Sequence, residues 1–264
     1  MAKVKDEKAL AKNEQAESYL ATSEMPDYLR DYIGDTTGNE NITTDDLTLP
    51  RLEIIQALSA ARQKDDPGYI EGADEGLLYN SLTRELYGKS VIIIPVAFRK
   101  EYLLWQDLAK GGGFGGAYPS LAEAEQIRQG LENPENWEAT KTHQHICYRL
   151  DPDGRVEEVA ISMARSKLKV SVRFNSLIRV VAGQLPRFAM AYKLSGQKVA
   201  NKQGQSYYNF AIEHAGYTPQ HIFEKAVQLY DMFKDNKVGV DYSNAQDDVQ
   251  GERFNGVDLG DDEM

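Results

Sequence analysis

The sequence predicts a mainly β domain with inserted helices, an α+β fold built on a partly open antiparallel barrel. Several short segments alternate apolar and polar residues with a period of two, and segments of helical periodicity interrupt them. A hydrophobic content of 41% and a charged content of 27% are typical of a globular chain with polar ends. We therefore expect a flexible polar segment over 1–46, a folded domain over 47–236 and a disordered acidic tail over 237–264.

Alternation and turn residues predict the elements of the first half. The folded domain should begin at Leu47, where apolar residues first come at close spacing. The run at 87–105 predicts two strands, with Pro95 marking an edge or a bulge. The glycine-rich run at 111–116 predicts a flexible loop, and a helix should follow it with Ser120 as its N-cap.

Hairpins and helices alternate in the second half. The residues Asp151–Gly154 supply the turn of a hairpin over 145–164. The segment 166–183 fits both a strand and a helix. Its length favours the helix, which would place Lys169 and Arg173 on one exposed face, one turn apart.

Two more strands and a helix complete the predicted domain. The strands cover 187–194 and 207–212, and alternation turns a set of side chains inward, namely Phe188, Met190, Tyr192, Leu194, Tyr208, Phe210 and Ile212. The helix should start at Thr218-Pro219 and bury a stripe made of Ile222, Ala226, Leu229, Tyr230 and Phe233. Short, curled strands with inserted helices indicate an OB-type barrel, whose sheet face and connecting loops hold oligonucleotides.

Charge is segregated along the chain. The 54 residues from Val159 to Ile212 contain no Asp or Glu, although the whole chain has 41 acidic residues against 30 basic ones. One carboxylate in such a track would repel phosphate, so the segregation predicts binding of a polyanion along a continuous positive channel. The alternative is a basic face that balances acidic neighbours in the fold. The nine basic residues are Arg165, Lys167, Lys169, Arg173, Arg179, Arg187, Lys193, Lys198 and Lys202.

Aromatic residues alternate with these cations, a mixture that suits single-stranded nucleic acid. Cations follow the phosphates, and aromatic faces stack on bases of any sequence. Tyr207 has the opposite parity to the inward rings and is the best stacking candidate, although it could also pack at the rim. Tyr102 and Trp105 have opposite parity, so at most one of them faces the ligand. The predicted contact residues are Arg165, Lys167, Lys169, Arg173, Arg187, Lys193, Lys198, Lys202, Tyr207 and Trp105.

The C-terminal stretch from Asp235 to Met264 holds nine acidic residues and little apolar content. Such a segment cannot bury enough surface to fold alone. A polyanion tethered beside a basic groove would compete with nucleic acid and would be available to partner proteins once displaced. The alternative is an inert solubilising tail. The residues predicted to contact partners are Asp258, Asp261, Asp262 and Glu263.

Several segments point together to a known family: LTRELYGKSVIIIPVAF with the glycine-rich loop, SMARSKLKV with FNSLI, YYNF, HIFEKAVQLYDMF and the tail. Through them the chain resembles bacteriophage single-stranded DNA-binding proteins of the OB-fold type with an acidic C-terminal tail. The resemblance runs from Leu47 to the end of the sequence, which is Glu263-Met264 where many related tails have an aromatic residue. It implies coating of single strands during replication and recombination, with the tail recruiting replication proteins or host RNA polymerase.

Enzyme and cofactor signals are weaker. Gly111, Gly113 and Gly116 satisfy a G-x-G-x-x-G pattern, but the residues before them are too polar for a buried parallel strand. We expect no catalytic residues and no cofactor, because no nucleophile motif is present. A zinc site remains open, with two histidines and a cysteine on one face of a strand and a fourth ligand from another; these are His143, His145, Cys147 and His214.

The first functional hypothesis is therefore a non-enzymatic, sequence-independent single-stranded DNA-binding protein. The second is a phage transcription or recombination accessory factor that acts mainly through protein partners, and the third is a metal-dependent nuclease. A single cysteine fits a reducing compartment, and the longest apolar run, at 91–98, is far short of the roughly 20 residues that a membrane span needs. We expect the protein to act in the cytoplasm of the infected host cell, without a membrane partner.

Overall fold

The structure is a computed structural model of the whole chain, and it describes residues 26–32, 34–35, 37–41, 46, 48–234 and 239–242. The chain divides into two compact units, residues 1–43 and 44–264. In the first unit, a 3-10 helix (η1) spans Asp27–Tyr32. Most of the predicted flexible N-terminal segment and of the predicted tail lies outside the described residues. Within the described residues, the helices are too short or too polar to cross a membrane.

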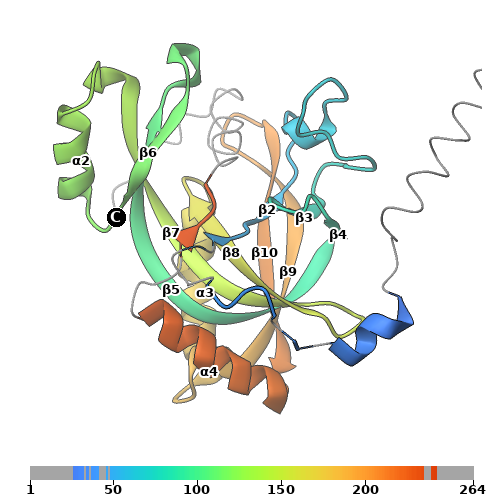
Figure 1. Cartoon of the computed structure of the whole chain (residues 1–264). Coiled ribbons are helices and arrows are strands. Elements are labelled where there is room, and N and C mark those ends of the chain that lie inside the picture. The colour runs from blue at the N-terminus through green and yellow to red at the C-terminus, as the bar shows by residue number, and fades with distance from the viewer. Residues whose placement is uncertain are drawn as a thin grey trace, which may run out of the picture. The chain divides into compact units, whose positions relative to one another are not determined.

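The second unit is mainly β with inserted helices, as predicted (Figure 1). Its helices are α2 (Leu121–Gln129), α3 (Lys167–Ala182) and α4 (Gln220–Lys234), with short 3-10 turns at Ala60–Arg62, Leu108–Lys110, Pro134–Asn136 and Arg187–Ala189. Its strands are β1 (Thr48–Leu49), β2 (Leu52–Ile54), β3 (Leu78–Asn80), β4 (Leu86–Gly88), β5 (Ser90–Gln106), β6 (Gly113–Tyr118), β7 (Trp137–Leu150), β8 (Val156–Ala164), β9 (Met190–Ala200), β10 (Ser206–Tyr217) and β11 (Gly239–Val240).

One antiparallel sheet forms the centre of this unit. Its strand order is β10-β9-β5-β7-β8, and β6 pairs with the far end of β5. Figure 1 shows β5 and β7 as long, strongly curved strands. The two edge strands do not pair with each other, so the sheet curls without closing into a barrel.

The segment around β2 lies between the two edges of the sheet. On one side Arg51 forms a parallel bridge with Ala160 of β8. On the other side the Gln56 side chain donates to the carbonyl of Tyr208 in β10 at 2.8 Å and accepts from its N–H at 2.9 Å. This segment therefore occupies the gap that a closed barrel would fill with direct strand pairing.

Of the segment 87–105, for which two strands were predicted, residues 87–88 end β4 and residues 90–105 form the single strand β5. Pro95 causes a register shift against β7, because proline has no N–H for the ladder, so the predicted bulge is confirmed. The glycine-rich run is not a loop. It forms β6, in which Phe114 pairs with Trp105 and Gly116 pairs with Leu104. A glycine can adopt the φ of +120° that position 116 requires.

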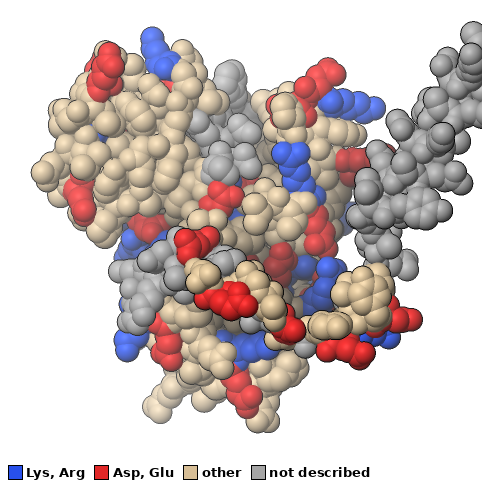
Figure 2. Space-filling view, viewed as in Figure 1, with Lys and Arg blue, Asp and Glu red and all other residues tan. Residues whose placement is uncertain are grey.

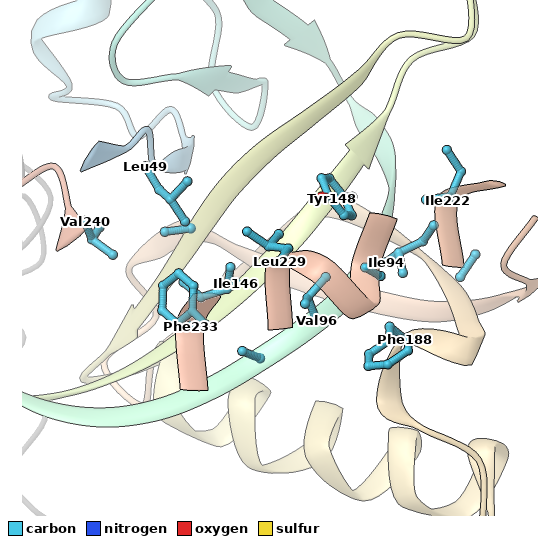
Figure 3. Packing of buried hydrophobic residues seen from close by; sticks show 14 of the residues in the cluster. Leu49, Ile94, Val96, Ile146, Tyr148, Phe188, Ile222, Leu229, Phe233 and Val240 are labelled. Atoms are coloured by element: carbon cyan, nitrogen blue, oxygen red, sulfur yellow. The ribbon is translucent and has the colours of Figure 1, made fainter. Parts of the chain in front are cut away.

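Side chains alternate between two cores, one on each face of the sheet. On the first face, α4 packs Ile222, Leu229 and Phe233 against β5 and β7, as Figure 3 shows. Leu49 of β1 and Val240 of β11 extend the same core. Each such side chain contributes about 1.5–3 kcal/mol when fully buried.

The second core lies on the opposite face of the sheet and is covered by α3. Phe174 and Ile178 of the helix pack among residues of β2, β5, β7, β8, β9 and β10. The helical interpretation of 166–183 is confirmed, as is the hairpin that turns at Asp151–Gly154. Phe188 was predicted to point to the same side as Met190, Tyr192 and Leu194. This was wrong, because Phe188 precedes β9 in a 3-10 turn and packs in the α4 core.

Candidate nucleic-acid interface

The exposed face of α3 carries basic residues and no acid. Helical geometry turns Ser171, Phe174 and Ile178 into the core, and each of them is buried. The opposite side, which we call the α3 outer face, is exposed to solvent. It consists of Lys169, Val172, Arg173, Ser176, Arg179 and Val180. Among the described residues, no carboxylate lies within ion-pair distance of its three cations.

Hydrogen bonds to the sheet fix α3 in place. The Ser171 hydroxyl lies 2.8 Å from His143 Nδ1 and 2.7 Å from His145 Nε2, both of β7. One turn further along the helix, Asn175 Oδ1 accepts from Nη2 of Arg187 at 3.3 Å. Arg187 lies in the 3-10 turn that follows α3. Because Ser171 is completely buried, Lys169 and Arg173, two residues to either side of it, lie on the solvent side of the helix.

Burial keeps both histidines neutral. Desolvation, with smaller contributions from Lys141 and Lys100, lowers the pKa of His143 to about 4. Desolvation and the nearby Arg187 hold the pKa of His145 well below its ordinary value. Neither histidine faces solvent, because α3 covers this face of β7.

The proposed zinc face is part of the second core. Burial raises the pKa of the Cys147 thiol to about 12, so it is a poor thiolate donor at neutral pH. Both histidines contact Ser171 rather than each other. Within the described part of the chain, no three His, Cys, Asp or Glu side chains are grouped to hold a metal ion.

Three of the predicted cations are turned away from the α3 outer face. Arg165 forms an ion pair with Glu138 at 2.7 Å. Lys167 is only 7% exposed, with its ammonium 5.8 Å from the centre of the Phe210 ring. Arg187 is partly buried beside His145. All three side chains therefore contact other residues of the fold, and none of them belongs to the α3 outer face.

The β9–β10 hairpin carries the other predicted cations. Lys193, Lys198 and Lys202 are exposed. Lys193 and Lys198 are five residues apart on β9 and therefore point to opposite faces. Lys193 also lies opposite Glu213 in the strand register. The hairpin therefore does not present its cations on a single surface.

The aromatic candidates also divide into buried and partly exposed side chains. Trp105 is 4% exposed and packs against Phe114 with 4.9 Å between ring centroids, so it cannot present a face to a base. Tyr207 is partly exposed on β10, as its parity predicted. Tyr102 is also partly exposed and lies on the face of β5 opposite to Trp105.

The nine cations do not line one continuous channel. On the face that Figure 2 shows, basic residues are interspersed with acidic ones. The cations that remain exposed form two groups, one on the α3 outer face and one on the β9–β10 hairpin.

The glycine pattern does not form a phosphate loop. Gly113 and Gly116 belong to β6, which pairs with β5, and Gly111 precedes that strand. A phosphate cradle needs a turn that leads directly into a helix N-terminus. Here a strand separates the glycines from α2, which begins at Leu121 with the predicted Ser120 cap.

The start of the predicted tail packs on the domain. β11 pairs in parallel with β1, and Val240 and Tyr242 are buried. The Tyr242 hydroxyl donates to Glu101 at 2.6 Å and accepts from the Gln144 amide at 2.8 Å. The packed domain thus extends six residues past the expected boundary. The predicted partner contacts lie outside the described residues and are Asp258, Asp261, Asp262 and Glu263.

Sequence reasoning missed two exposed cations beside the histidines. Lys100 of β5 is the register partner of His143, and Lys141 lies two residues before His143 on β7. All three side chains therefore share one face of the sheet. Both lysines lie outside the acid-free window, so charge segregation could not reveal them. A prediction of the β5–β7 register, with its shift at Pro95, would have placed both lysines beside His143.

Taken together, the described features define a curled antiparallel sheet with a basic helix on one face and a helix-covered core on the other. The chain matches the family model described as Pam3 phage gp34-like protein over residues 13–239. It therefore belongs to this family and is a bacteriophage protein. No curated protein and no solved structure matches it.

Proposed function

We propose that this phage protein binds single-stranded DNA without sequence preference and protects it during phage replication and recombination in the cytoplasm of the infected host. The α3 outer face is the observation that carries the proposal. Lys169, Arg173 and Arg179 are exposed there, and their helix contains no acid to repel a phosphate backbone.

The strand order supports an OB-type assignment for the domain. β5 pairs with both β7 and β9, β8 follows β7, and α3 connects β8 to β9. OB-type domains are five-stranded, partly open barrels that bind oligonucleotides. The face of β7 and β8 that lies opposite to α3 is covered here by α4 and by residues 239–242. The α3 side and the β9–β10 loop are therefore the surfaces that we assign to the nucleic acid.

The protein in this proposal is a binding protein and not an enzyme. The acidic residues beyond Tyr242 would compete with the nucleic acid for its cations and, when displaced, would contact replication proteins or host RNA polymerase. Such competition needs no ordered tail, because tethering alone gives a high effective concentration.

A charge-matched mutant pair tests the proposal. The triple variant Lys169→Ala/Arg173→Ala/Arg179→Ala is compared with Lys64→Ala/Lys110→Ala/Lys225→Ala, whose side chains are also exposed. Anisotropy of a labelled oligo(dT) is measured at two salt concentrations, with duplex DNA as competitor. Each single-strand phosphate contact contributes about 0.7 to the log–log salt slope. The first variant should lose about 2 from the slope and bind at least tenfold more weakly, and equal affinities of the two variants would refute the proposal.

A further inference from the structure

A buried series of hydrogen bonds under α3 runs from Arg187 through His145 and Ser171 to His143. The positions of its protons follow from which of these groups can donate. Arg187 Nη2 lies 3.4 Å from His145 Nδ1, and a guanidinium can only donate. His145 must therefore carry its proton on Nε2 and donate it to Ser171 Oγ. The serine hydroxyl is then left to donate to His143 Nδ1. His143 consequently carries its proton on Nε2.

This last N–H has no hydrogen-bond partner among the described residues. His143 is 5% exposed, so water satisfies the donor poorly, and an unsatisfied buried donor costs about 1–3 kcal/mol. The charged groups that act on the ring are Lys141 and Lys100, and neither can accept a hydrogen bond. An anion is the acceptor that this N–H and the two ammonium groups can share, because all three interact favourably with negative charge.

The surroundings fit a nucleotide. Burial falls along one face of β7, from Cys147 and His145 at 0% exposed, through His143, to the exposed Lys141. Beside Lys141 on β5 lies its register partner Tyr102, whose ring is partly exposed. Residues paired in this way have Cβ atoms about 4.5–5.5 Å apart.

We propose that Lys100, Tyr102, Lys141 and His143 form a site for one nucleotide of a single strand, with the phosphate held by the two lysines and His143 Nε2–H and the base stacked on Tyr102. This inference rests on the proposed function and adds a second contact region to the α3 outer face. Both regions border the Ser171 turn, since Ser171 lies directly on His143.

Two measurements test the site. The first compares Lys100→Ala/Lys141→Ala with Lys64→Ala/Lys110→Ala in oligo(dT) binding. Loss of two phosphate contacts should flatten the log–log salt slope by about 1.4 and weaken binding about tenfold at 0.1 M salt. Tyr102→Leu should weaken binding about tenfold without changing the slope, because it removes stacking and no charge.

The second measurement follows the His143 Nε2–H resonance by NMR as inorganic phosphate is titrated into the full chain. A saturable shift that is lost in Lys100→Ala/Lys141→Ala supports the anion site independently of DNA. If the wild-type protein binds oligo(dT) while the double variant keeps its affinity and slope, and the resonance does not move, the inference is wrong and the proposed function stands. If the wild-type protein binds no oligonucleotide but the resonance shifts, the proposed function fails and the anion site stands.

Discussion

Ser171 of α3 lies within hydrogen-bonding distance of two buried histidines of β7, 2.8 Å from His143 Nδ1 and 2.7 Å from His145 Nε2. A single hydroxyl thereby satisfies two ring nitrogens and fixes the helix on the sheet. The position of the basic α3 outer face depends on this contact, so stability and the candidate interface are linked.

Ser171→Ala should therefore lower the free energy of unfolding by about 2–4 kcal/mol, because it leaves two buried histidine nitrogens without a partner. Urea unfolding measures the change. Ser176→Ala on the outer face of the same helix is the control, since its exposed hydroxyl only donates to the Val172 carbonyl. Equal stabilities of the two variants would show that the buried contact contributes little.

Stability should decrease as pH falls through the histidine range. Both histidines have folded-state pKa values below the ordinary 6.5, and that of His143 is about 4. Below pH 6.5 the unfolded chain binds protons that the folded chain excludes, so their stabilisation is complete above 6.5 and is lost towards pH 4. The slope is at most about 1.4 kcal/mol per pH unit for each histidine. Urea titrations at pH 7, 6 and 5 should show it, and His143→Gln should make the dependence shallower.

The boundary of the tail can be tested with two truncations. Removing residues 243–264 should leave the unfolding free energy unchanged and tighten binding of oligo(dT), because seven acids are removed. Removing residues 237–264 also deletes β11 and Tyr242 and should lower stability by several kcal/mol, since two buried side chains are lost. Unchanged DNA affinity in the shorter deletion would eliminate tail competition.

Tyr207 and Trp105 should respond in opposite ways to substitution. Tyr207→Leu should weaken oligo(dT) binding about tenfold with little change in stability, as expected for a lost stacking platform of about 1–3 kcal/mol. Trp105→Phe should leave affinity unchanged and lower stability, because that ring packs in the core. Anisotropy and urea unfolding on both variants separate these effects, and the reverse pattern would reassign the ligand face.

Local patterns predicted the elements whose signals are local. α3, α4 and the hairpin at Asp151–Gly154 depend on periodicity and turn residues within one segment, and all three are present. β6 and β11 were missed because they depend on partners elsewhere. The glycine-rich run forms a strand because β5 lies beside it. β11 pairs with β1, which is about 190 residues earlier in the sequence.

The candidate site was likewise predictable only where its signals are local. Helical geometry alone placed Lys169 and Arg173 together on an exposed face. Counting charge could not show that Lys167 turns inward, because that depends on the packing of α3 against Phe210. Burial of Trp105 likewise follows from β6, which the sequence did not suggest.

The pairing of β1 with β11 brings residues 48–49 beside residues 239–240, on the sheet face opposite to α3. Copies arrayed along a DNA strand through α3 would all carry this strand pair on the side away from the nucleoprotein axis. A label attached at the exposed Thr48 or Gly239 should accordingly leave the DNA-facing side accessible.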